Sequence, residues 1–174
     1  MKGTLKPIRA TILWGLLGAI IYLPATLFLH ALIPWPLGDL LVLWALLAGY
    51  SLILCRWAPK PISSVALPLT LLLIAALFIH SAAAFVYMSM GILGWIRSGM
   101  CFRRRPAAMR FIVEIGLGVG AGLAMSAVVS TATISAALGI WLLFLIQALY
   151  FVIFEYRQEQ ANRLDVDSFD RARM

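Results

Sequence analysis

The longest uncharged stretch of the chain, residues 115–154, reads IGLGVGAGLAMSAVVSTATISAALGIWLLFLIQALYFVIF. It holds 40 residues without an Asp, Glu, Lys or Arg. A helix needs about 20 apolar residues to cross the hydrocarbon core of a bilayer, so this stretch has room for two crossings. Its apolar residues do not alternate with polar ones as in a barrel strand, which favours helices. We expect spans at about 111–129 and 134–154.

Three further uncharged windows come earlier in the chain, at residues 10–38, 40–55 and 61–96. The chain is 63% hydrophobic and only 12% charged, and an ordinary soluble domain has about twice that charged fraction. The sequence therefore predicts an all-α integral membrane protein, a bundle of about five transmembrane helices. We assign residues 1–157 to this bundle and residues 158–174 to a polar cytoplasmic tail.

The window at 61–96 allows an alternative path. A helix over 65–96 would be about 48 Å long, more than the bilayer core needs. The alternative is four spans plus a re-entrant hairpin of two short helices at 61–96. That hairpin collects all fourteen Lys and Arg residues on one side of the membrane, whereas five crossings place nine of them with the tail. Because residues 79–84 contain no Gly, Pro or Asn for a turn, five crossings are our prediction.

The most basic stretch, residues 97–106, reads RSGMCFRRRP. Lys and Arg flank cytoplasmic span ends, so both paths give a cytoplasmic basic loop and a cytoplasmic tail, typical of a bacterial inner membrane protein. We expect this loop to attract anionic lipid head groups, and Glu114 to pair with Arg110 four residues earlier. Charges at span ends do not form a nucleic-acid-binding face. The loop's basic residues are Arg97, Arg103, Arg104, Arg105 and Arg110.

Closely spaced small residues mark the predicted span 111–129. They recur four apart, at 116/120, 118/122 and 122/126, and such steps let two helix backbones approach closely. The pattern is not a nucleotide-binding loop, because it follows no strand and lies in lipid-compatible sequence. We predict that this helix packs inside the bundle, with a second contact to another subunit as an open alternative. The packing residues are Gly116, Gly118, Gly120, Gly122 and Ser126.

The two histidines, His30 and His80, are candidate cofactor ligands. A pair of histidines on facing helices can hold a b-type haem axially, and a quinone or proton role is a further possibility. Nothing in the flanking residues supports either role, so we expect hydrogen bonds to neighbouring helices instead, no metal and no cofactor. Asp39 is placed to cap the helix that follows it, and Gln147 to join two helices.

The sequence contains no catalytic motif, no metal-ligand cluster and no phosphate loop. We therefore predict a non-catalytic small membrane subunit, a scaffold or assembly partner of a larger complex. Its expected partners are the lipid bilayer and other membrane subunits, and no nucleic acid. Two alternatives stay open: a small transporter or channel component, which would need polar groups along a path, and a haem- or quinone-binding redox subunit that uses His30 and His80.

Overall fold

The computed structural model describes residues 7–33, 37–57, 62–79, 81–97, 107–129 and 136–153. These residues form helices and no strand, which confirms the prediction of an all-α chain for the described part. The helices are α1 (Pro7–His30), α2 (Leu37–Trp57), α3 (Ser63–Phe78), α4 (Ala82–Gly94) and α5 (Ala107–Val129). An apolar helix at Ala136–Ile153, called here the last helix, follows α5.

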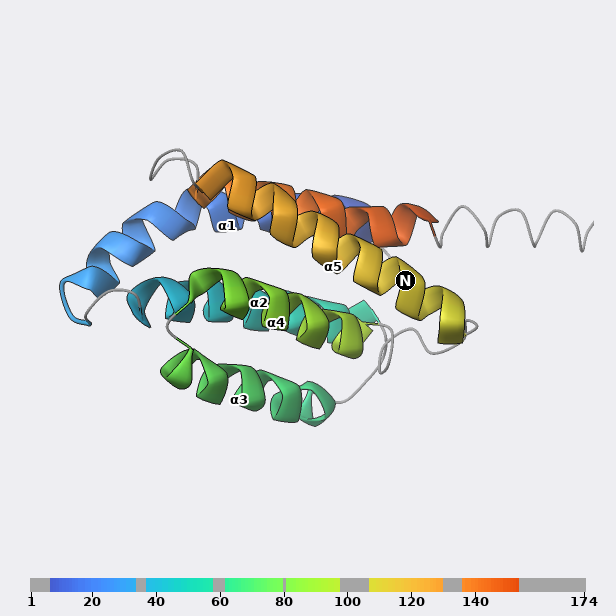
Figure 1. Ribbon diagram of the computed structural model, residues 1–174, viewed down its shortest axis with the longest axis horizontal. Coiled ribbons are helices and arrows are strands. Elements are labelled where there is room, and N and C mark those ends of the chain that lie inside the picture. The colour runs from blue at the N-terminus through green and yellow to red at the C-terminus, as the bar shows by residue number, and fades with distance from the viewer. Residues whose placement is uncertain are drawn as a thin grey trace, which may run out of the picture.

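Successive helices run in alternating directions, so the described chain passes back and forth along one axis (Figure 1). α2 contacts α1, α3 and α4, and α4 also contacts α5. The last helix reaches α2 where the rings of Tyr50 and Phe144 meet edge to face, 5.2 Å apart. In the view of Figure 1, α1, α5 and the last helix lie above α2 and α4, and α3 lies below them.

The core lies around α2, the most enclosed helix. An apolar helix without a polar face is expected in the interior, and α2 has that character. Two indole N–H groups bind backbone carbonyls beside it: Trp14 donates to Leu46 at 3.0 Å and Trp44 to Leu69 at 2.9 Å. The buried hydrophobic residues of α2 are Leu40, Val42, Leu43, Leu46, Leu47, Tyr50, Leu54 and Cys55.

The predicted single span over 64–96 is wrong: two antiparallel helices, α3 and α4, occupy this window (Figure 1). The helix stops because Ile79 and Ser81 adopt extended backbone conformations. The Ser81 hydroxyl accepts a hydrogen bond from the Ala84 N–H at 3.4 Å and caps α4. The chain therefore reverses direction within this window, as in the hairpin alternative, and the cap after the break is Ser81 and not a Gly, Pro or Asn.

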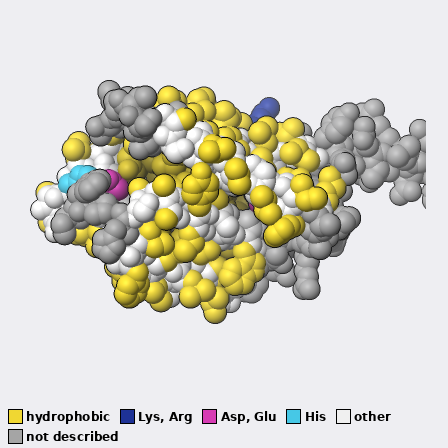
Figure 2. Space-filling view, in the orientation of Figure 1, with side chains coloured by type: hydrophobic (Ala, Val, Ile, Leu, Met, Phe, Trp, Pro, Cys, Tyr) yellow, Lys and Arg dark blue, Asp and Glu magenta, His cyan; other side chains and the backbone are white. Residues whose placement is uncertain are grey.

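The outer surface of the bundle is strongly apolar (Figure 2). Exposed large hydrophobic residues occur on each of the helices, among them Leu27 on α1, Leu67 on α3 and Ile112 on α5. Three helices, Pro7–His30, the α2 segment Leu37–Arg56 and the last helix, are long and apolar enough to cross a membrane. An outside covered by such side chains fits hydrocarbon better than water.

Candidate functional site

The final turn of α4 directs a charged side chain into the core. Residues 95–97 form a wide, π-helical turn, and the Trp95 N–H reaches the carbonyls of both Gly91 and Ile92. Such turns shift the register of the residues that follow and are frequent at functional sites. Arg97, the last residue of this turn, is fully buried.

The Arg97 guanidinium is held by three groups. Its Nε donates to Glu114 Oε1 at 3.0 Å, and its Nη2 donates to Glu114 Oε2 at 2.5 Å. Its Nη1 donates to the backbone carbonyl of Gln147 at 3.2 Å. The guanidinium carbon also lies 4.0 Å from the centre of the Tyr150 ring. This is a two-pronged arginine–carboxylate pair of the kind that fixes geometry most strongly.

The carboxylate depends on a close approach between α4 and α5. Gly94 lies against Glu114, and a Cβ at that position would come within 3.1 Å of Oε2. A glycine there leaves room for the carboxylate to reach Arg97. The glycine at position 94 thus allows α4 and α5 to lie close together at the ion pair.

Further polar groups surround the pair. Gln147 donates through Nε2 to the Met90 sulfur at 3.2 Å, and its buried Oε1 has no hydrogen-bond partner in the described part of the chain. Tyr50, on α2, is fully buried and lies within electrostatic range of both Arg97 and Glu114. Its hydroxyl shares a hydrogen bond of 3.0 Å with Thr11 of α1. We call Arg97, Glu114, Gln147, Tyr150, Tyr50 and Thr11 the arginine centre.

The arginine centre connects α1, α2, α4, α5 and the last helix. A buried charge is costly unless it is paired and hydrogen-bonded, and removal of one partner leaves the other uncompensated. All three guanidinium nitrogens of Arg97 have acceptors. The centre is thus suited to holding five helices in register. Among the described residues, no three His, Cys, Asp or Glu side chains are placed to hold a metal ion.

The structure changes the interpretation of the predicted basic loop. Arg97 is not part of an exposed loop, because the π-helical turn carries it into the core. Glu114 pairs with Arg97, 17 residues away in sequence, a partner that we did not predict. The predicted partner, Arg110, lies in α5, but its side chain is outside the described residues, as are Arg103, Arg104 and Arg105.

The predicted glycine pattern divides between two faces of α5. A Cβ at Gly118 would lie 3.5 Å from Met90, and one at Gly122 would meet the Tyr87 ring, so these two glycines pack against α4. At Gly116 and Gly120 a Cβ would meet none of the described atoms within 4 Å. The hydroxyl of Ser126 is exposed and donates to the Leu123 carbonyl of its own helix at 2.9 Å.

Of the two histidines, the structure describes the side chain of His30 only; His80 lies outside the described residues. The His30 Nε2 lies 3.1 Å from an Asp39 carboxylate oxygen, and the histidine is the cyan patch in Figure 2. Both residues lie where α1 ends and α2 begins, opposite the end of α4 that precedes Arg97 (Figure 1). The prediction that Asp39 caps this helix is wrong, because α2 begins at Leu37 and Asp39 lies inside its first turn, where its charge still suits the helix dipole. The contact joins the end of α1 to the start of α2.

Sequence reasoning missed Tyr50, Tyr150 and Thr11 as members of a polar centre. Each is isolated among apolar residues, and neither its spacing nor its neighbours separate it from an ordinary core residue. The chain matches no known protein family, and no curated protein or solved structure gives a significant match to it.

Proposed function

We propose that this chain is a non-catalytic membrane subunit that binds another membrane protein through the outer face of α5. The observation that carries the proposal is the division of the glycines on this helix. Gly118 and Gly122 face α4, whereas Gly116 and Gly120, also four residues apart, are open as far as the described residues show. Open glycines at this spacing are the usual means by which a second membrane helix makes backbone contact.

The neighbours of the open glycines support this proposal. Ile112 is 70% exposed, and Val119 and Leu123 are also exposed on the same side of α5. Branched aliphatic side chains beside a glycine pair form the ridges that a partner helix packs between. We call the surface formed by Ile112, Gly116, Val119, Gly120 and Leu123 the outer glycine face.

We further propose that the helices span a bacterial inner membrane with the arginine-rich end in the cytoplasm. Arg9, Arg56 and Arg97 lie at one end of the described bundle, and the ion pair of His30 with Asp39 lies at the other (Figure 1). The remaining Lys and Arg residues belong to segments that adjoin the arginine-rich end along the chain. Basic residues favour the cytoplasmic side, so both 1–6 and 154–174 belong there.

This orientation is tested by cysteine labelling of intact cells in a variant with Cys101 replaced by serine. Thr4→Cys and Ser168→Cys are expected to stay protected from a membrane-impermeant thiol reagent, and Thr131→Cys to react. Labelling at Thr4→Cys together with protection at Ser168→Cys would restore the odd number of crossings that we first predicted.

The buried charge favours a second candidate, a component of a small transporter. Ionisable groups inside a membrane protein often mark a substrate or proton path, and the buried Gln147 Oε1 has no partner in the described part of the chain. All three Arg97 nitrogens are, however, already engaged. The subunit function is therefore the one that we propose.

The decisive experiment is purification of the tagged chain from its native membrane in mild detergent, followed by mass spectrometry and an absorption spectrum. We expect a second membrane protein to co-purify with the parent, and to be lost with Gly116→Leu and with Gly120→Leu. Gly91→Leu is the matched control, because Gly91 is an equally open glycine on α4. Equal recovery of the partner in all three variants, or no partner with the parent, would contradict the proposal.

The spectrum in the same experiment tests the redox alternative. We expect a colourless protein. A haem absorption band that disappears in both His30→Gln and His80→Gln would identify a redox subunit in place of the assembly role.

A further inference from the structure

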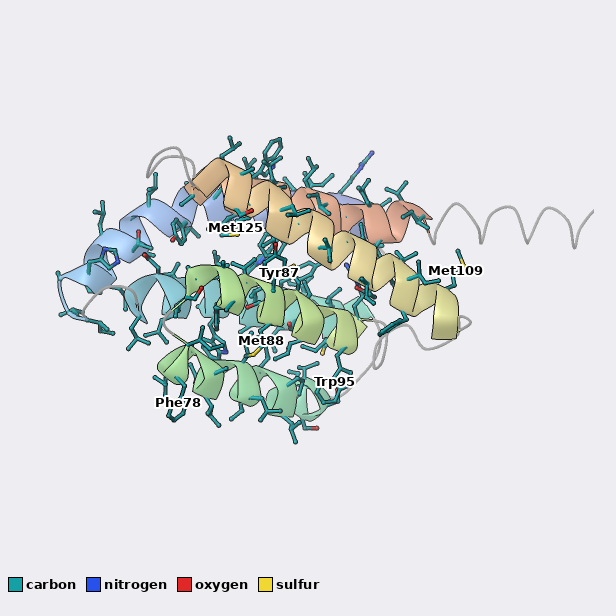
Figure 3. The ribbon with its side chains drawn as sticks, viewed as in Figure 1. Phe78, Tyr87, Met88, Trp95, Met109 and Met125 are labelled. Atoms are coloured by element: carbon teal, nitrogen blue, oxygen red, sulfur yellow. The ribbon has the colours of Figure 1, made fainter. Side chains whose placement is uncertain are left out.

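A half-open cavity of about 290 Å³ lies between α4 and α5, far from the arginine centre. Ala82, Ala83, Val86 and Tyr87 of α4 form one wall, and Gly122, Met125 and Ser126 of α5 form the other. Tyr87 and Met125 lie on the facing sides of the two helices in Figure 3. We call this cavity the α4–α5 groove.

The groove exists because small residues face each other at this level of the bundle. Two alanines begin α4, and Gly122 of α5 leaves space that the ring of Tyr87 enters. Protein interiors normally have few voids larger than a water molecule. A cavity of this size between two packed helices therefore marks a place for an occupant.

The chemistry of the groove selects an apolar occupant. Its lining is almost wholly hydrocarbon, and the hydroxyl of Ser126 is already committed to the Leu123 carbonyl of α5. Among the described residues at this end of the bundle, the ionisable His30 and Asp39 bind each other. No charge is thus placed to hold an anionic or cationic ligand at the groove in the described structure.

The remaining segments of the chain are poor candidates for the occupant. Residues 1–6, 98–106 and 154–174 adjoin the opposite end of the bundle along the chain. The segment that adjoins the groove, residues 130–135, reads STATIS and is mostly polar. Residues 34–36 and 80 also adjoin this end, but they are short links with a described helix on each side. We therefore take the occupant to come from outside the chain. The groove's own α4 residues Ala82, Ala83 and Tyr87 are exposed, so the groove opens to the outside of the bundle along α4.

We propose that the α4–α5 groove binds one acyl chain of a membrane lipid from the non-cytoplasmic leaflet. The volume of 290 Å³ is close to the lower bound of small-molecule sites, about 300 Å³. It is roughly twice the 150 Å³ of an engineered apolar cavity that takes up benzene. Several methylene groups of a chain fit such a space. Selectivity comes from shape, because lipid tails are as apolar outside the groove as within it.

The proposal rests on the membrane insertion and orientation proposed above and not on the assembly role, so the groove and the assembly role can each fail without the other. The test uses the purified full chain in phosphatidylcholine vesicles that contain a phospholipid with a photoreactive diazirine on its acyl chain. After illumination, mass spectrometry maps the labelled residues. We expect groove residues to carry at least fivefold more label than Leu67 and Leu71 of α3, which are exposed outside the groove.

Two matched variants test whether the groove itself causes the enrichment. Ala83→Phe places a ring in the groove and is expected to lower groove labelling to the level of α3. Ala84→Phe adds the same ring to the next residue, which is exposed but does not line the groove, and is expected to leave labelling unchanged. Circular dichroism checks that both variants keep the helix content of the parent.

Three outcomes would overturn the proposal. Equal labelling of the groove and of α3 would mean that lipid contacts the surface without a site. Groove labelling that survives Ala83→Phe would place the label elsewhere on α4 or α5. A groove that is labelled in vesicles but protected in native membranes would have a protein helix as its occupant in the cell.

Discussion

α4 and α5 meet in two contrasting ways along their length. Near the arginine-rich end, Arg97 and Glu114 fill the contact with a buried ion pair. At the other end, the Tyr87 ring enters the space beside Gly122, and the groove stays open. One end depends on directional hydrogen bonds between charged groups, and the other on small residues. The difference shows that the same two helices are held together by the ion pair at one end and leave room for a ligand in the groove at the other.

The largest effect is expected at the ion pair. Glu114→Ala leaves the Arg97 charge buried without its carboxylate, and should lower the free energy of unfolding by about 3–5 kcal/mol. Reversible unfolding by sodium dodecyl sulfate in mixed micelles measures this value. The double variant Arg97→Met with Glu114→Leu removes both charges and should recover most of the loss. A loss under about 1 kcal/mol for Glu114→Ala would mean that the Arg97 guanidinium is not buried in the folded bundle.

A smaller effect is expected at the glycine contact. Gly122→Leu forces the new side chain against the Tyr87 ring, and should cost about 1–3 kcal/mol by overpacking. The control, Gly116→Leu, adds the same side chain where a Cβ meets no atom, and should change stability by less than about 0.5 kcal/mol. The same unfolding measurement serves for both. Equal losses would show that the two faces of α5 do not differ as described.

The smallest effect is expected far from both contacts. His30→Gln removes an ion pair between partly exposed side chains, 34% and 25% exposed, and should cost about 0–1 kcal/mol. Asp39→Asn should cost a similar amount, and the double variant should cost no more than the larger single loss, because the two residues act on each other. Additive losses in this double-mutant cycle would show that the two side chains do not interact.

Much of the fold could be predicted from the uncharged windows. They indicated α1, α2, α5 and the last helix, because a long apolar run can satisfy its backbone hydrogen bonds in a membrane only as a helix or in a closed barrel. The break between α3 and α4 could not be predicted, because the cap that starts α4 is a single serine, Ser81, beside a run of alanines. Serine is a favourable N-cap, but many serines in helical proteins do not cap a helix, so a single serine does not predict a helix start.

The candidate site was less predictable than the fold. Sequence spacing suggested a local partner for Glu114, and tertiary packing supplied Arg97, 17 residues away. A π-helical turn changes which way a side chain points and leaves no clear sequence signal. In the structure Gly118 and Gly122 face α4, and the glycine spacing did not say which of the overlapping steps on α5 would do so.

The central position of α2 has a consequence for biosynthesis. A chain is made from its N-terminus, so α1 and α2 exist before α4, α5 and the last helix. The hydroxyl of Tyr50, which ends fully buried, finds its partner Thr11 on the helix made just before it. Arg97, in contrast, is synthesised before its partner Glu114, which belongs to the next helix. We therefore expect α1 and α2 to pack against each other before the later helices are made. Arg97 can be fully paired only after both α5 and the last helix have been synthesised.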